Sequence, residues 1–195
     1  MLAQQLPMHL QQQHPPRNVG RSLSNNTTGG LSVRQFASAA PYRPVNQATL
    51  ELIKFSEGFV PMPAPDQVGM ATVGYGHQCQ QPRCSEISQW LPLTPFTAQK
   101  LLLLDIVPFS EALATYLRYP DRLNNNQWGA LVSWAYNVGT ESVRMSKLVK
   151  RINNGENPSM VVAAELPQWD YAGGQRLLGL TRRRAAELLL FNTIS

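Results

Sequence analysis

The sequence predicts an α+β fold in which a small β-hairpin lobe and a larger helical lobe are joined by a long helix, with a cleft between them. A short alternating run, Met70 to Tyr75, follows a proline-rich segment and indicates a small antiparallel sheet. From Thr94 to Phe191, apolar residues recur at helical spacing between capping residues and glycines. The second pattern predicts that most of the core is helical.

The chain has 195 residues, enough for one domain with a substantial core and a tail. Residues 1–45 lack apolar periodicity and are rich first in Gln and then in Ser, Asn, Thr and Gly, which predicts a disordered tail or a targeting segment. They lack the apolar region of a signal peptide, but their scattered Arg and Ser are similar to an organelle presequence. A linker and a mis-assigned start remain alternatives. The folded domain is expected to cover residues 46–195.

Charge is unevenly placed along the chain, whose formal net charge is +5. No acidic residue precedes Glu51, whereas four arginines do, which leaves 13 basic and 12 acidic residues for the remainder. The basic balance therefore belongs to the tail, and we expect no nucleic-acid-binding face on the folded domain. No apolar run is long enough to predict a membrane span.

The first elements of the domain are a helix and two strands. Residues 48–55 form a short amphipathic pattern that Asn46 or Gln47 can cap, and Gly58 supplies the stop. Prolines at 61, 63 and 65 cannot donate ladder hydrogen bonds, so the first strand should be an edge strand or poorly formed. Residues 68–75 should form the better strand, and residues 78–93 a polar loop.

The helical part begins at Thr94-Pro95, where Thr is a good cap and Pro suits the first turn. Pro108 should bend or end this helix, with a further segment reaching Tyr119. Asn124 can cap a core helix that ends at Gly139. Further helices are expected over residues 143–153, 159–169 and 180–191, the last preceded by a glycine loop at 172–174.

Three residues around the first helix end and the hairpin suggest hydrolytic chemistry: Glu57, Asp66 and Thr72. A protonated carboxyl can donate to a leaving oxygen, while an ionised one activates water, as glycosidic hydrolysis requires. Glu57 ends a helix, where the dipole disfavours its charge. Each residue also has an ordinary interpretation: a solvated helix-end Glu, a turn Asp and a β-forming Thr.

These residues lie in a pattern that resembles the phage-type lysozymes. The pattern is a helix ending in E-G, a D-x-x-G turn and T-[IV]-G-x-G-H, here Glu57-Gly58, Asp66 to Gly69 and Thr72 to His77. It continues to the last helix with A-L-x-S-[FW]-x-[FY]-N-x-G at 130–139 and G-L-x-x-R-R-x-x-E at 179–187. The sequence of residues 164–191 most resembles the secreted fungal branch of the family.

The resemblance implies a lysozyme-like fold and a muramidase that cleaves the β-1,4 bond between N-acetylmuramic acid and N-acetylglucosamine in peptidoglycan. Glu57 would be the general acid, and Asp66 with Thr72 would hold the attacking water. Inversion at the anomeric carbon is implied, which requires carboxyls about 6.5–9.5 Å apart. His77 would pair with Asp105 and tie the β-lobe to the long helix. We expect no cofactor and a monomer.

Four further residues are candidates for contact with the sugar. Tyr136 and Asn137 end the core helix, where packing and a helix cap are the alternatives. Gly173 and Gly174 would shape the far wall of the cleft. The run of arginines at 182–184 is typical of a solvated charged face. Two of these arginines match the family pattern, and for these two both ion pairing and substrate contact are open.

Cys79 and Cys84 are the only cysteines and could close a small disulfide loop, as expected of an exported protein. No second Cys or His cluster accompanies them, so no metal site is expected. The resemblance suggests an extracellular location. Ala64 stands where the family usually has Tyr, and prolines crowd the first strand, so an inactive lysozyme-fold binding module is one alternative. Chitin or chitosan hydrolysis by the same carboxylates is the other.

Overall fold

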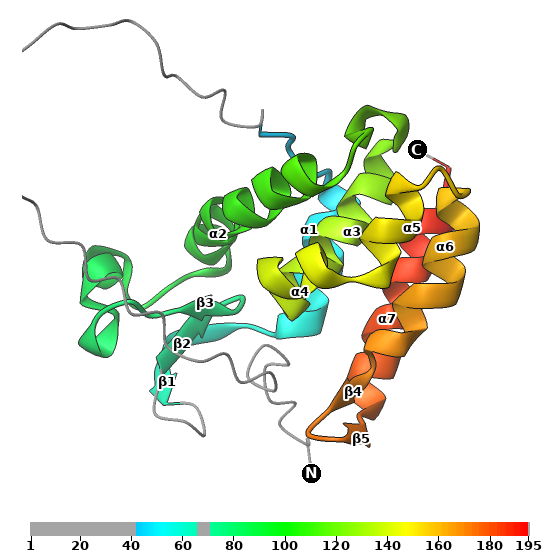
Figure 1. The fold of residues 1–195 in the computed structure, drawn as a ribbon. Helices are drawn as coiled ribbons and strands as arrows, with labels where there is room; N and C mark the ends of the chain where they lie inside the picture. The colour runs from blue at the N-terminus through cyan, green and yellow to red at the C-terminus, as the bar shows by residue number, and fades with distance from the viewer. Residues whose placement is uncertain (1–41, 66–70, 195) are drawn as a thin grey trace, which may run out of the picture.

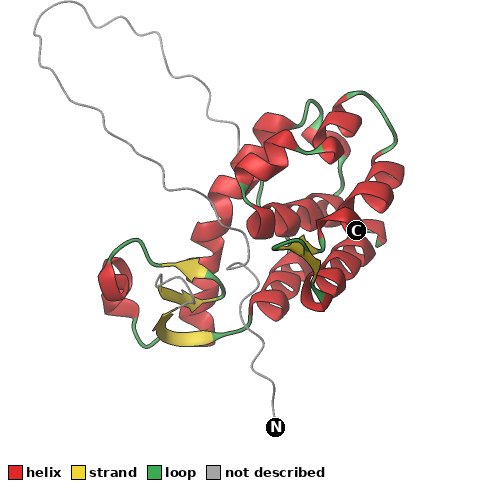
Figure 2. Ribbon diagram, turned by 60° about the horizontal axis from the view of Figure 1, so that its bottom comes forward, coloured by secondary structure: helices red, strands yellow, loops and turns green. Residues whose placement is uncertain are grey.

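The computed structural model describes residues 42–65 and 71–194, which form a small β-lobe and a larger helical lobe (Figure 1). The predicted α+β class is confirmed. Figures 1 and 2 show the three-stranded sheet at one end, the helical lobe at the other, and α2 running between them. No helix within the described ranges is both long and apolar enough to cross a membrane.

Helix α1 (Gln47–Glu57) leads into the sheet. Asn46 caps it by accepting a hydrogen bond from the Thr49 amide, and Gly58 ends it at a φ of 75°. Strands β1 (Val60–Pro65), β2 (Ala71–Gly74) and β3 (His77–Gln78) pair antiparallel in the order β1-β2-β3. The register of β1 shifts between Val60 and Ala64, in the stretch where prolines cannot donate.

Helix α2 (Pro95–Tyr116) begins at the predicted capping residue, and Thr94 and Thr97 form a reciprocal capping box. Pro108 was expected to bend or end this helix, and it does not end it, since the helix continues for two more turns. Pro108 and Leu104, whose carbonyl loses its partner, are both exposed, so water can satisfy that carbonyl. The predicted polar loop before α2 contains a 3-10 segment, Pro82–Trp90.

Helix α3 (Asn125–Val138) is the centre of the core, and its residues from Trp128 to Val138 are all buried. Asn124 caps it and Gly139 ends it, as predicted. It lies against α1 so closely that a Cβ on Gly129 would come within 1.7 Å of the Thr49 hydroxyl. Glycine is therefore required where the two helices cross.

The remaining elements are α4 (Thr140–Met145), α5 (Lys147–Asn153), α6 (Pro158–Glu165), a 3-10 turn (Leu166–Trp169), the hairpin β4 (Tyr171–Ala172) and β5 (Gln175–Arg176), and α7 (Leu178–Asn192). The single helix predicted over 143–153 is split, because the Ser146 side chain accepts from the Val149 amide and starts a new helix there. The glycine loop at 172–174 is part of the β4–β5 hairpin.

Both ends of the described domain meet at α3. The side chain of Asn126 accepts a hydrogen bond from Asn46 at 2.7 Å and donates one to the carbonyl of Thr193 at 3.0 Å. Upstream of residue 46, the guanidinium of Arg43 donates to the carbonyls of Pro120 and Leu123. Packing against the helical lobe thus extends three residues ahead of the predicted boundary, because Arg43 reaches carbonyls between α2 and α3.

Candidate active site

Glu57 is the last residue of α1, and its side chain is fully buried between the lobes. One carboxylate oxygen, Oε1, accepts a hydrogen bond from Nη1 of Arg183 at 2.6 Å. The other, Oε2, is buried and has no hydrogen-bond partner among the described residues. An arginine can only donate, so Oε1 must accept, and any proton on this carboxyl belongs on Oε2.

Arg183 belongs to a buried polar network that surrounds this carboxylate. Its Nε donates to Oε1 of Glu187 at 3.2 Å and its Nη2 donates to the carbonyl of Ser133 at 3.1 Å. Burial alone would lower the pKa of the Arg183 guanidinium, but the charges of Glu57 and Glu187 outweigh burial and raise that pKa. Arg183 therefore stays charged while holding Glu57 in place.

Arg184 completes the network beside Glu187. Its Nη2 donates to Glu187 at 2.9 Å and to Oδ1 of Asn137 at 3.0 Å. Burial lowers the pKa of the Arg184 guanidinium, with the nearby Arg183 adding to the effect. Two arginines and two glutamates balance one another, which is the condition under which buried charges are tolerated.

The family pattern matched Arg183, Arg184 and Glu187 and left ion pairing and substrate contact open for the two arginines; the structure shows ion pairing. In the run at 182–184 only Arg182 is exposed, as a solvated charge run would be, whereas Arg183 and Arg184 are buried ion-pair partners. The i,i+4 spacing of Arg183 and Glu187 was the available local signal. It could not reveal Glu57, which lies 126 residues away in the chain.

Gly76 faces the unpaired oxygen of Glu57. A Cβ at this position would lie 3.2 Å from Oε2 and 3.3 Å from the hydroxyl of Tyr136, and the φ of Gly76 is +89°. Tyr136 is itself buried and donates its hydroxyl proton to the carbonyl of Tyr75 at 3.0 Å. Burial raises the pKa of Tyr136 well above its ordinary value, and the charges of Asp105 and Glu57 add to the rise. Tyr136 thus stays neutral beside Glu57.

The other predicted catalytic residues belong to the β-lobe. Thr72 lies on β2, is buried, and stands opposite Ala64 on one side and Gln78 on the other. Asp66 lies outside the described residues. The separation of the two carboxyls therefore stays a prediction.

The predicted sugar contacts fall in two places. Asn137 is buried in α3, where its side-chain oxygen accepts a hydrogen bond from Arg184. This contact is internal and favours neither a sugar contact nor a helix cap. Gly173 and Gly174 form the exposed turn of the β4–β5 hairpin with φ values of 58° and 77°, the left-handed conformations that such a turn requires. Their contact with substrate stays a prediction.

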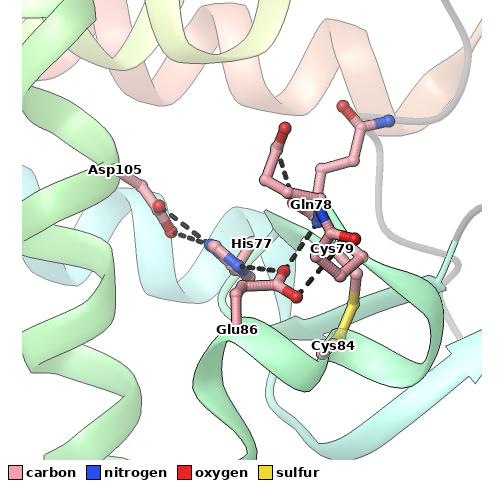
Figure 3. Close-up of a disulfide and its surroundings, with 8 residues drawn as sticks. His77, Gln78, Cys79, Cys84, Glu86 and Asp105 are labelled. Carbon is pink, nitrogen blue, oxygen red and sulfur yellow. Dashed lines mark hydrogen bonds and ion pairs between the residues drawn. A yellow bond between two sulfur atoms is a disulfide. The ribbon is translucent and has the colours of Figure 1, made fainter.

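His77 connects β3 to the long helix. Its Nδ1 lies 2.9 Å and 3.0 Å from the two oxygens of Asp105 on α2 (Figure 3). On the opposite side, its Nε2 lies 3.6 Å from Oε1 of Glu86. Burial alone would lower the pKa of His77, but its hydrogen bond to Asp105 and the two carboxylate charges outweigh burial and raise it.

Glu86 links this histidine to a disulfide loop. Its carboxylate accepts from the amides of Gln80 at 2.6 Å and Gln81 at 3.2 Å, between the two cysteines (Figure 3). Cys79 and Cys84 are joined by a disulfide with a Cα–Cα distance of 4.7 Å. The two sulfurs and Glu86 lie within 4.8 Å of one another, but the disulfide removes the thiolates that a metal would bind.

Comparison with known proteins points to one family. The phage lysozyme family matches residues 54–187. The endolysin of Bacillus phage PZA is 34% identical over 154 residues, covering 76% of this chain and 55% of the relative. The SAR-endolysin of bacteriophage PS119 is 32% identical over 131 residues, covering 67% of this chain and 73% of the relative.

Solved structures agree with these sequence relatives. The muramidase domain of SpmX from Asticaccaulis excentricus is 32% identical, with a TM-score of 0.65 over 78% of this chain and 100% of that one. A P22 lysozyme is 26% identical, with a TM-score of 0.67 over 77% of this chain and 99% of that one. The chain spans about half the length of the endolysins of Bacillus phages PZA and B103, at 55% and 54%.

Proposed function

Because this chain belongs to the phage lysozyme family, we propose that it is a muramidase that hydrolyses the β-1,4 bond between N-acetylmuramic acid and N-acetylglucosamine in bacterial peptidoglycan. The observation that carries the proposal is the carboxyl of Glu57. One of its oxygens is fixed by a charged guanidinium and the other is left without a partner. A general acid needs this asymmetry, because its proton must sit on a defined atom that faces the leaving group.

In the proposed reaction, Glu57 donates the proton on Oε2 to the glycosidic oxygen as the bond to the anomeric carbon breaks. Asp66, assisted by Thr72, orients a water molecule that attacks the opposite face of the sugar. Asp66 accepts the proton that this water loses. The product is inverted at the anomeric carbon. Arg183 supports this cycle by stabilising the Glu57 carboxylate left after proton transfer.

This chemistry requires that Glu57 becomes accessible, since its side chain is fully buried. Gly58 follows Glu57 directly, has a φ of 75°, and has open space around the position of a Cβ. A change of backbone angle there would move the β-lobe without disturbing α1. We therefore include in the proposal an opening of the β-lobe about Gly58 when a glycan strand binds.

A panel of three substrates tests the function. The wild-type protein should clear a suspension of Gram-positive cell walls, and Glu57→Gln, which keeps the shape of the side chain, should lose most of that activity while remaining folded. Clearing by Glu57→Gln at the wild-type rate would contradict the assignment. A chitin or chitosan hydrolase would act only on those polymers, and a binding module would sediment with walls without clearing them.

The proposal extends to setting and assembly. The Cys79–Cys84 disulfide supports an oxidising, extracellular location. The sequence of residues 164–191 supports a position near the secreted fungal branch of the family. We also propose that the protein acts as a monomer. Sedimentation equilibrium of the purified protein tests the monomeric state. Thiol titration of protein taken from the medium tests the oxidising location.

A further inference from the structure

The β4–β5 hairpin carries an arginine whose position is fixed from two sides. Nε of Arg176 lies 3.1 Å from Oδ2 of Asp170, and its guanidinium carbon lies 5.3 Å from the centre of the Tyr171 ring. Asp170 is only 3% exposed and is itself held by the hydroxyl of Thr181 at 2.9 Å. Holding an arginine in this way reduces the side-chain entropy that a ligand would otherwise have to remove on binding.

The end of this guanidinium faces solvent. The side chain of Arg176 is 64% exposed, and only its Nε is paired, so within the described ranges Nη1 and Nη2 have no protein partner. These two nitrogens form the fork that binds a carboxylate through two parallel hydrogen bonds. Tyr171, 50% exposed, adds an aromatic surface beside the fork. A planar anion attached to a larger, partly apolar molecule fits this pair.

The hairpin is connected to the start of α7, the helix that carries Arg183. The Leu177 amide donates to the carbonyl of Asp170, and Thr181 of α7 donates to its carboxylate. Arg183, which holds Glu57, lies five residues after the first residue of α7, or about 7.5 Å along the helix axis. Figure 1 shows the hairpin beside the start of α7, on the side of the helical lobe where α1 ends.

Resting on the muramidase function proposed above, we propose that the guanidinium of Arg176 binds a carboxylate of the short peptides that peptidoglycan strands carry. Arg176 then selects peptide-bearing glycan over bare glycan, because a strand without peptides keeps only the short lactyl carboxylate on each N-acetylmuramic acid and lacks the carboxylates that the peptides carry farther from the sugar. Tyr171 supports the contact by lying against the peptide beside that carboxylate. Arg176 is a specificity residue here and takes no part in bond cleavage.

Arg122 provides a matched control. Its guanidinium carbon lies 4.3 Å from the centre of the exposed Tyr119 ring, so it is also an arginine stacked on a tyrosine. It lies between α2 and α3 instead of beside α7. The variants Arg176→Gln and Arg122→Gln each remove the charge of an exposed arginine that stacks on a tyrosine, at different places, and Arg176→Gln also removes the ion pair with Asp170.

The experiment measures kcat/KM on two soluble substrates: glycan strands that keep their peptides, and the same strands after an amidase has removed them. Both are prepared free of anionic wall polymers. Arg176→Gln should lower kcat/KM on peptide-bearing strands by about tenfold, mainly through KM, and leave the value on bare strands unchanged. Arg176→Lys, which keeps the charge but loses the fork, should recover only part of the loss. Arg122→Gln should match wild type on both substrates.

An equal loss on both substrates would overturn the inference, as would Arg176→Gln and Arg122→Gln behaving alike, or full recovery with Arg176→Lys. Those outcomes leave the muramidase function intact. The function itself fails only if the wild-type protein cleaves neither substrate. Arg122→Gln should stay within about 2 °C of the wild-type melting temperature, because exposed substitutions shift stability by about 0.5 kcal/mol or less. Arg176→Gln leaves the buried Asp170 with one partner fewer, so kcat/KM of every variant is measured well below its own melting temperature, where each is fully folded.

Discussion

The sharpest test of the buried network is Arg183→Met. Met has a long unbranched side chain that can fill most of the same volume without a charge. The change removes the donor to Glu57, Glu187 and the Ser133 carbonyl. Two buried glutamates then remain with one buried arginine, Arg184, and the site carries an uncompensated negative charge.

Removing one partner of a buried ion pair costs about 3–5 kcal/mol in free energy of unfolding. In a domain of about 150 residues, each kcal/mol lowers the melting temperature by about 2–4 °C, so we expect a decrease of about 6–20 °C. Calorimetry and urea titration at neutral pH measure it. Arg182→Met is the control, since Arg182 is the exposed neighbour on the same helix and should change stability by about 0.5 kcal/mol or less.

Adding Glu57→Gln to Arg183→Met should recover part of the loss, because it removes the carboxylate that lost its partner. Measured together with the two single variants, this pair of changes gives the coupling energy between Glu57 and Arg183. If Arg183→Met is as stable as Arg182→Met, or if the double variant shows no coupling, the network does not hold Glu57 and the reasoning is refuted.

Three other changes test separate parts of the structure. His77→Asn should lower the melting temperature most below about pH 6.5, where the raised pKa of His77 lets its ion pair with Asp105 contribute fully. The difference in melting temperature from wild type should shrink as pH rises through the folded-state pKa, and activity should be largely spared. A difference that does not change with pH would contradict the ion pair. Gly76→Ala should cost about 1–3 kcal/mol for its left-handed φ and should reduce kcat more strongly than stability predicts, because the new Cβ presses on Glu57; kcat equal to wild type would argue against that contact. Gly129→Ala should destabilise by about 3 kcal/mol or more in chemical denaturation, since its Cβ would overlap a threonine of α1, and a near-neutral result would mean that α1 and α3 lie farther apart.

Local signals in the sequence predicted most helix boundaries correctly. Asn46, Thr94 and Asn124 cap the helices that they were expected to cap, because a side-chain oxygen beside the first free amides acts over three residues and needs no distant partner. That Pro108 does not end its helix has a related reason. Its effect depends on whether the carbonyl four residues earlier can reach water, and exposure is decided by the tertiary fold.

The candidate site was only partly predictable from the sequence. The family pattern pointed to Glu57 and to the pair of His77 and Asp105, and the structure brings the latter two within 2.9 Å. It matched Arg183 and Arg184 but did not predict that Arg183 pairs with the buried Glu57, because these two residues are 126 positions apart in the chain. Long-range pairing of charges leaves no mark on local composition.

The amide of Asn126 has a consequence for how the domain can be joined to other chains. It holds Asn46 at the start of α1 and Thr193 just after α7, so both ends of the domain lie at one point on α3. A short linker could therefore join the two ends, and new ends could be opened in an exposed connection such as the one between α5 and α6. The same geometry would let the domain be inserted whole into a surface loop of a carrier protein, with both attachments beside Asn126.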